Sequence, residues 1–253
     1  MLEQHTPSDQ ALAGTAIFIT GAASGLGAAL AQVLARSGAD IVVGDIKYAM
    51  AARVAEVLCD SGARAVPLGV EVGDPAGAER AIANAIEHFG RLDVLINNAG
   101  TDTTLPIAEL TAELTAEQWL RVIDTNLKGP FLMAKHAAAH MRLAGGGHII
   151  NVASTATRRA WPNASACHAS NWGLLGLSHA LHAELCAHNI KVTAIIAGGM
   201  RTPFLLDRFP DLDPGTLQDP ENVAQAIRSV LLMPAESVIA ELTVLPQQES
   251  SWP

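Results

Sequence analysis

A glycine-rich segment at residues 17–27 constrains the fold of this chain more than any other stretch. It reads I-F-I-T-G-A-A-S-G-L-G, so a short apolar run of strand formers is followed by three glycines. After the glycines, apolar residues return at the spacing of a helix. The pattern predicts a strand, a tight turn and a helix whose free N–H groups and positive end suit a pyrophosphate.

The glycines of this turn are Gly21, Gly25 and Gly27, in the spacing G-x-x-x-G-x-G. Glycine permits a sharp turn and lets a ligand approach the backbone closely. We therefore take the three glycines, with Ser24 and Leu26 between them, as candidate cofactor-binding residues. A purely structural strand-to-helix turn also uses glycines and remains the alternative.

Apolar strand-like runs alternate with helical patterns along the rest of the chain, which predicts a parallel sheet with right-handed crossovers. Strands are expected at residues 17–19, 41–44, 65–70, 92–96, 148–152, 191–196 and 242–245. Helices are expected at residues 51–58, 78–89, 117–142, 169–188 and 220–232, the first of them with Val54, Val57 and Leu58 on one face. The prediction is a single α/β domain over residues 14–253, Rossmann-like and doubly wound, with seven parallel strands and helices on both faces. A flexible tail is expected at residues 1–13.

Composition narrows the class of protein. A net charge of −9 over 253 residues argues against nucleic acid or an anionic membrane as a partner. The three cysteines form no C-x-x-C pair, and residues 1–14 lack the apolar core of a secretion signal. We therefore expect a cytoplasmic protein. Two histidine pairs at helical spacing, at 136/140 and 179/182, are interpreted as helix-face residues, and no metal site is expected.

Asp45 ends the second expected strand, about 20 residues after the glycines. At this place in a doubly wound fold, a carboxylate accepts hydrogen bonds from the adenosine ribose hydroxyls and repels a 2′-phosphate. The alternative is an aspartate that only shapes the turn. The position favours the first reading and predicts NAD as the cofactor.

Two motifs together resemble the short-chain dehydrogenase/reductase family: residues 20–27, reading T-G-A-A-S-G-L-G, and residues 97–100, reading N-N-A-G. The resemblance runs from about residue 14 to residue 245 and implies an oxidoreductase that binds a nicotinamide dinucleotide. The implied cofactor-binding residues beyond the turn and Asp45 are Glu71, Val72, Asn98, Ala99, Gly100, Gly198 and Thr202. Glu71 and Val72 stand where the family has an aspartate beside the adenine, and Thr202 would contact the carboxamide end.

The resemblance fails where the family carries out proton transfer. The family has a serine after the fifth strand, a tyrosine thirteen positions later and a lysine four beyond that. Ser154 fits the serine, but the other two positions hold Cys167 and Asn171, and the only tyrosine of the chain is Tyr48. The fourth catalytic position of the family is kept as Asn126.

Two hypotheses follow. The chain is either an NAD(H)-binding protein with impaired catalysis or an active oxidoreductase that uses Ser154 with Cys167 or His168 as the substitute acid/base. The motifs leave the substrate or small-molecule ligand open. Family resemblance also implies a homo-oligomer, a dimer or tetramer, through the helices expected at 117–142 and 169–188. Small residues on these helices, among them Ala134, Ala137 and Ala180, favour close packing.

Overall fold

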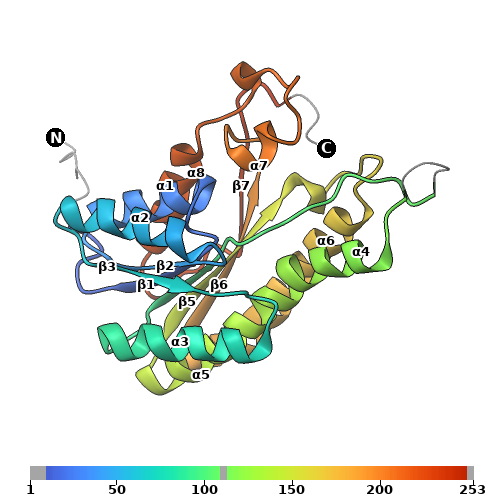
Figure 1. Cartoon of the computed structure of the whole chain (residues 1–253). Coiled ribbons are helices and arrows are strands. Elements are labelled where there is room, and N and C mark those ends of the chain that lie inside the picture. Colours follow the sequence, from blue (N-terminus) through green and yellow to red (C-terminus); the bar gives the residue numbers. More distant parts are fainter. Residues whose placement is uncertain (1–9, 109–112, 250–253) are drawn as a thin grey trace, which may run out of the picture.

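Seven parallel strands form one twisted sheet in the order β3-β2-β1-β4-β5-β6-β7 (Figure 1). This computed structural model describes residues 10–108 and 113–249. The strands are β1 (Ala16–Thr20), β2 (Asp40–Asp45), β3 (Ala65–Gly69), β4 (Val94–Asn97), β5 (Gly147–Ser154), β6 (Ile190–Ala197) and β7 (Glu241–Val244). The predicted fold class, a doubly wound α/β sheet with seven parallel strands, is confirmed.

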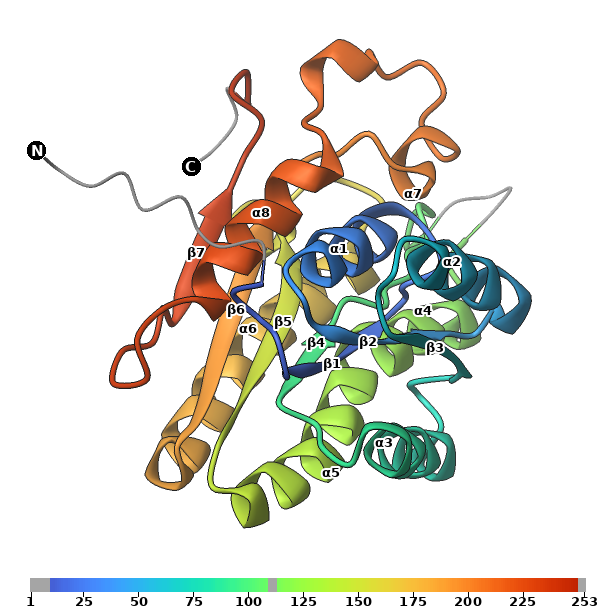
Figure 2. The ribbon, with the colours of Figure 1, turned by 90° about the vertical axis from the view of Figure 1, so that its left-hand side faces the viewer.

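Helices cover both faces of the sheet. They are α1 (Gly25–Arg36), α2 (Tyr48–Asp60), α3 (Pro75–Phe89), α4 (Ala116–Ile123), α5 (Gly129–Ala144), α6 (Ser165–Leu185), α7 (Pro203–Leu206) and α8 (Pro220–Leu231). Figure 2 shows α1, α2 and α8 on one face and α3, α5 and α6 on the other. A hydrophobic core lies on each face of the sheet, and alternate residues of β1 point into one or the other. Ile17 and Ile19 pack under α1 and α8, whereas Phe18 packs under α3 and α5. A strand buried on both faces is apolar without a break, which is why the short runs were recognisable.

The topology brings the predicted motifs to one edge. Strand β1 lies between β2 and β4, so the strand order reverses there, and ligands of doubly wound sheets bind outside the carboxyl ends at such a point. The turn after β1, Asp45 at the end of β2, Asn98 after β4 and Ser154 at the end of β5 all lie on this edge. No helix among the described residues is long and apolar enough to cross a membrane.

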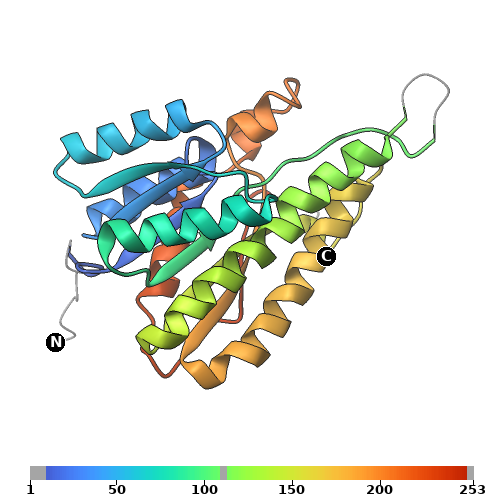
Figure 3. The same ribbon diagram turned by 60° about the horizontal axis from the view of Figure 1, so that its bottom comes forward.

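The long helix expected at 117–142 is interrupted. Helices α4 and α5 are joined by a π-helical turn, Asp124–Lys128, and run beside α6 (Figure 3). Pro130 lacks an N–H group and cannot donate to the carbonyl of Asn126 four residues earlier, so a wider turn fits here. The alanines expected to mediate packing between subunits need correction as well, because Ala134 and Ala137 are fully buried in the subunit's own core.

Three smaller expectations also change. Of the expected tail, residues 1–9 lie outside the described residues, but Leu12 is buried against the core, and its N–H donates to the carbonyl of Ser37. In α2 the buried face consists of Ala51, Ala55 and Leu58, whereas Val57 is exposed. Helix α6 begins at Ser165, earlier than expected, because Asn163 adopts a positive φ of 62° that allows the chain to turn into the helix.

Candidate active site

The turn between β1 and α1 is built from backbone that leaves no room for side chains. Gly21 has a φ of 65°, and a Cβ there would lie 2.7 Å from the Cα of Ala99. A Cβ on Gly27 would lie 2.1 Å from the carbonyl oxygen of Gly21. Helix α1 begins after Ser24, and no side chain caps its start. The N–H groups of its first turn therefore face the carboxyl edge of the sheet without a capping side chain. Such a helix start suits an anionic group.

The polar side chains around the turn tie neighbouring strands together. The Thr20 hydroxyl accepts hydrogen bonds from the N–H groups of Asn98 and Ala99, both at 3.0 Å. The Asn98 amide donates to the carbonyl oxygens of Thr20 and Gly21, at 2.9 and 3.2 Å. The structure therefore brings together the predicted turn residues, Asn98 and Ala99. Gly100 follows directly in the same loop.

Asp45 lies beside this turn. Its carboxylate accepts hydrogen bonds from the N–H of Ala23 at 3.1 Å and from the N–H of Lys47 at 2.9 Å. Each oxygen accepts one of these bonds and keeps a lone pair for another donor. Asp45 therefore both fixes the turn and presents negative charge next to it.

The other predicted cofactor residues lie at the rim of the same edge. The side chain of Thr202 lies 3.4 Å from where a Cβ of Gly25 would be, so the loop after β6 closes against the glycine-rich turn. Gly198 starts this loop and donates its N–H to the carbonyl of Val244. Val72 is buried, with its side chain close to Gly129.

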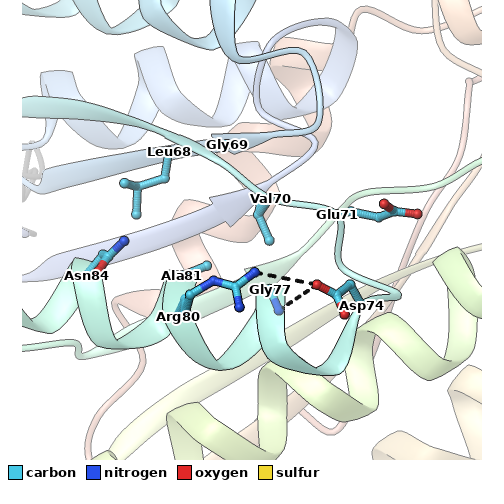
Figure 4. Close-up of a pocket in the computed structure, with 9 residues that line it drawn as sticks. All are labelled: Leu68, Gly69, Val70, Glu71, Asp74, Gly77, Arg80, Ala81 and Asn84. Carbon is cyan, nitrogen blue, oxygen red and sulfur yellow. Dashed lines mark hydrogen bonds and ion pairs between the residues drawn. The ribbon is translucent and has the colours of Figure 1, made fainter.

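Glu71 is exposed and lines a groove of about 260 Å³ between β3 and α3 (Figure 4). The groove is polar because Asp74 caps α3 by accepting the Gly77 N–H at 2.8 Å and pairs with Arg80 at 3.6 Å. Glu71 and its neighbour Val72 thus point into different surroundings, one into solvent and one into the core.

The features of this edge fit a dinucleotide. The uncapped start of α1 would hold a pyrophosphate between Gly21 and Gly27, and the Asp45 carboxylate would accept the ribose hydroxyls. The loop containing Asn98 and the loop containing Thr202 border the remaining length of the edge.

Three of the predicted catalytic residues, one at the end of β5 and two in α6, are joined by hydrogen bonds among themselves. Asn171 accepts the N–H of Ser154 through its Oδ1 at 2.9 Å. Its Nδ2 donates to the carbonyl of Cys167 at 2.9 Å and to the Cys167 Sγ at 3.6 Å. Asn171 is buried, and both the oxygen and the nitrogen of its amide are hydrogen bonded, so it links β5 to α6. Its amide carries no charge.

Cys167 is a neutral thiol in this setting. Burial, with a smaller effect of the Asp102 carboxylate, raises the pKa of the Cys167 thiol to about 12. A thiol with that pKa is neither a base nor a ready proton donor at neutral pH. Cys167 therefore offers no group that exchanges a proton readily near pH 7.

Asn126 lies in the π-helical turn and is brought to the same place. Its amide accepts the N–H of Thr101 and donates to the carbonyl of Thr101, both at 2.8 Å, and its Nδ2 also contacts the Ser170 hydroxyl at 3.3 Å. The wide turn aims Asn126 at the loop after β4. The predicted set of Ser154, Cys167, Asn171 and Asn126 therefore surrounds one region at the ends of β4 and β5.

His168 faces a different set of partners. The Trp161 N–H donates to its Nε2 at 3.1 Å, so the ring proton is on Nδ1, which lies 3.2 Å from the carbonyl oxygen of Ala156. The Trp161 ring also packs edge-on against the imidazole, at 4.4 Å between centroids. Both nitrogens are thus used in holding the loop at 156–161.

Sequence reasoning missed an ion pair beside these positions. Arg208, just after α7, contacts the Asp102 carboxylate at 3.2 Å and the Asp102 carbonyl at 3.3 Å. Burial raises the pKa of the Asp102 carboxyl despite the opposing effects of the Thr103 N–H and Arg208. The two residues are 106 positions apart, and only the place of Asp102, two residues beyond Gly100, was visible in the sequence. In the described residues no three histidine, cysteine or acidic side chains gather as a metal site.

A doubly wound sheet with a glycine-rich turn and a carboxylate at the end of β2 defines a dinucleotide-binding fold of the oxidoreductase type. The family model for short chain dehydrogenases matches residues 15–213, and the chain belongs to this family.

Relatives of established activity extend the likeness. The chain is 37% identical to the cis-4-hydroxycyclohexanecarboxylate dehydrogenase of Sinomonas cyclohexanicum, over 86% of this chain and 89% of that protein. It is 34% identical to the cyclohexanol dehydrogenase of an Acinetobacter species, over 84% and 86%. A metagenomic short-chain oxidoreductase solved in complex with NADP superposes with a TM-score of 0.81 at 27% identity, covering 94% of this chain and 99% of that one. A nicotinamide cofactor is therefore a property of the family, whereas the choice between NAD and NADP is not fixed by the fold.

Proposed function

We propose that this protein binds NAD(H) and a small ligand but carries out the ordinary hydride-transfer reaction of its family slowly or not at all. The observation that supports this most directly is the hydrogen-bonded arrangement of Ser154, Cys167 and Asn171, in which Asn171 braces the backbone in place of a charged lysine.

The chemistry explains the expected loss. The nicotinamide accepts or donates a hydride when bound, and an alcohol must lose a proton, or a ketone gain one, in the same event. A phenol with an unperturbed pKa near 10 performs this transfer when a neighbouring ammonium lowers its pKa. The Cys167 thiol is shorter and has a pKa of about 12, and Asn171 contributes no charge. Ser154 can still orient a carbonyl oxygen, but its hydroxyl does not supply a proton at neutral pH.

Asp45 supports NAD over NADP. Its carboxylate lies next to the turn, within hydrogen-bonding distance of the Ala23 N–H, so a 2′-phosphate near it would meet negative charge. Residues 21–27 contain no arginine or lysine to compensate.

The alternative is an active oxidoreductase that uses Ser154 with Cys167 or His168. Its support is the similarity to dehydrogenases that act on cyclohexanol and hydroxycyclohexanecarboxylate. Against it stand the high pKa of Cys167 and the contacts of His168, whose two nitrogens face Trp161 and Ala156. We therefore place the impaired enzyme first.

The helices α4, α5 and α6 support a homo-oligomer. Each of the three helices exposes a large apolar side chain, at Leu120, Phe131 and Trp172. We propose that a second copy covers them. A reducing, cytoplasmic location is supported by the three cysteines, which are all free thiols.

One experiment separates the two functions. NADH binding is measured by calorimetry, and turnover is then assayed on a panel of cyclic and open-chain alcohols and ketones with the wild type, Cys167→Ala and His168→Ala. We expect NADH to bind and turnover to stay far below the 1 to 10³ per second of ordinary enzymes. A robust wild-type rate that either alanine variant abolishes would establish the alternative.

A further inference from the structure

The ion pair between Asp102 and Arg208 joins two loops directly beside the catalytic positions. Asp102 lies in the loop after β4, next to Thr101, which is hydrogen bonded to Asn126. Arg208 follows α7, in the segment that begins at Thr202 beside the glycine-rich turn. The Asp102 carboxylate also acts electrostatically on Cys167 and His168. A ligand that reaches Ser154 or Cys167 therefore comes close to this pair.

The guanidinium of Arg208 is held in a way that does not depend on Asp102 alone. It lies over the ring of Phe204, with 4.6 Å between the guanidinium carbon and the ring centroid. Its Nη1 and Nη2 point at two oxygens of one residue, the carboxylate and the carbonyl of Asp102. Two N–H donors side by side, on a group already held by an aromatic ring, match the two oxygens of a carboxylate.

The ion pair of Arg208 with Asp102 is longer than that of Arg64 with Asp40, which serves below as its control. Its two contacts are 3.2 and 3.3 Å long, whereas Arg64 contacts Asp40 at 2.7 Å, and charge-assisted bonds of this kind are usually 2.7–2.9 Å. Both side chains keep some exposure, 25% for Arg208 and 13% for Asp102. Asp102 has a second donor in the Thr103 N–H at 2.7 Å, so it keeps a hydrogen bond when Arg208 leaves.

We propose that Arg208 is the binding residue for a small organic carboxylate, which takes the place of Asp102 on the guanidinium when the ligand enters beside Cys167. This inference rests on the proposed function, since it names the class of ligand that the same site accepts. No covalent step is involved. One ion pair is exchanged for another, and Phe204 holds the guanidinium plane during the exchange.

Carboxylate binding at Arg208 is coupled to the protonation of Asp102. The charged and titratable groups that act on Asp102 are Arg208 from the segment after α7 and His168 and Cys167 from α6. Arg208 opposes the effect of burial on Asp102, so losing it to a ligand raises the pKa of the Asp102 carboxyl further. The complex therefore binds more protons than the free protein, and carboxylate affinity rises as the pH falls.

The test is titration of the full chain with benzoate and with its uncharged analogue benzamide, in the presence and absence of NADH. For the wild type, benzoate should bind more tightly than benzamide. Arg208→Met should weaken benzoate about tenfold or more and leave benzamide unchanged, because a bond to a charged group is lost. Arg208→Lys should fall between the two, since it keeps the charge without the paired donors.

The direction in which Asp102→Asn changes the benzoate affinity is the decisive result. Removal of the competing carboxylate should make benzoate bind more tightly than in the wild type, a gain that misfolding does not produce. The rise of benzoate affinity with falling pH should also flatten in this variant, because residue 102 no longer binds a proton. The matched control is Arg64→Met, since Arg64 likewise pairs with an aspartate and lies over a phenylalanine, at 5.3 Å from Phe89, but far from the site. It should leave both affinities unchanged.

Three results would overturn the inference: benzoate binding no better than benzamide, an unchanged benzoate affinity in Arg208→Met, or weaker benzoate binding in Asp102→Asn. The last result would mean that the pair only fastens the two loops. These outcomes are separate from the proposed function. If NADH binds and benzoate does not, only this inference fails. If NADH does not bind, the proposed function fails, and the titration without cofactor still decides the role of Arg208.

Discussion

The glycine-rich edge and the predicted catalytic residues of β5 and α6 use their polar groups in opposite ways. At the glycine-rich edge, helix α1 starts without a side-chain cap, and Asp45 keeps lone pairs beside the turn. At the catalytic positions, the amide of Asn171 bonds to Ser154 and Cys167, and the His168 ring bonds to Trp161 and Ala156. The glycine-rich edge keeps hydrogen-bonding groups available for a ligand, whereas the side chains of Asn171 and His168 use theirs in bonds within the protein. We therefore expect substitutions to affect cofactor binding and turnover separately.

The difference also shows what a motif can establish. Four hydrogen bonds join the end of β1 to the loop after β4. Thr20 accepts two of them through its hydroxyl, and Asn98 donates the other two from its side-chain amide. These residues stabilise the fold with or without a cofactor, so their presence alone supports the architecture more than the activity. Substitutions at Cys167 and Asn171 test the proposed activity more directly, because these residues carry the predicted catalytic role.

The largest expected effect comes from restoring the missing pair. Cys167→Tyr combined with Asn171→Lys should raise turnover by about 10² to 10⁴-fold over the wild type, the usual worth of a positioned acid/base. Each single change should gain far less, because the phenol needs the ammonium to lower its pKa. The measurement is NADH oxidation on the carbonyl panel at fixed pH. A double variant no faster than its singles, with NADH binding retained, would show that the defect lies elsewhere.

The second effect concerns the state of the thiol. With a pKa raised by burial to about 12 from an ordinary value near 9, the thiolate fraction of Cys167 at pH 8 is lower by about 10³-fold. Iodoacetamide labelling followed by mass spectrometry should therefore modify Cys59 and Cys186, which are exposed, long before Cys167.

The Asn171→Lys variant sharpens this measurement. An ammonium at that position stabilises the thiolate and should speed the labelling of Cys167, while Cys59 and Cys186 serve as internal standards. Labelling of wild-type Cys167 as fast as Cys59 would contradict the assignment of a neutral, inert thiol.

A smaller effect is expected at the other region. In Gly27→Ala the new Cβ would lie 2.1 Å from the Gly21 carbonyl, so the turn must shift, at a cost of about 1–3 kcal/mol of stability. NADH binding should be lost with it. The matched control is Gly176→Ala in α6, where a Cβ meets nothing within 4 Å and should stabilise the helix by about 0.5–1 kcal/mol. Thermal unfolding and NADH titration of both variants check this, and tight NADH binding by Gly27→Ala would argue against the turn as the pyrophosphate site.

The strands and most of the helices could be predicted from local patterns, for physical reasons. Strands buried on both faces are mostly apolar, as in residues 16–19 of β1 and 94–96 of β4, and helix starts carry recognisable signals, such as Asp74 followed by Pro75 in α3. Ser154, Cys167 and Asn171 were singled out by the family resemblance, whose spacing was counted along the sequence, and they lie on one strand end and one helix turn.

What the sequence did not reveal depends on tertiary contacts. The pairing of Asp102 with Arg208 joins loops far apart in the chain, and no periodicity marks either residue. The side of a helix that faces the core was misjudged at Val57 and Ala134, because short apolar residues suit both a core and a subunit interface. The contacts of His168 depend on where α6 begins, which Asn163 decides through a left-handed backbone conformation.

The smallest effect tests the choice of cofactor. The wild type should bind NADH more tightly than NADPH, because the Asp45 carboxylate accepts ribose hydroxyls and repels a 2′-phosphate. Asp45 also accepts the N–H groups of Ala23 and Lys47, so Asp45→Ala removes both the charge and the support of the turn. Asp45→Asn keeps an acceptor of the same shape and removes only the charge. Calorimetry should show the gap between NADH and NADPH narrowed in both variants, with NADH weakened by about tenfold in Asp45→Ala, the worth of one bond to a charged group, and by less in Asp45→Asn. Equal or tighter NADPH binding by the wild type would mean that Asp45 shapes the turn without selecting the cofactor.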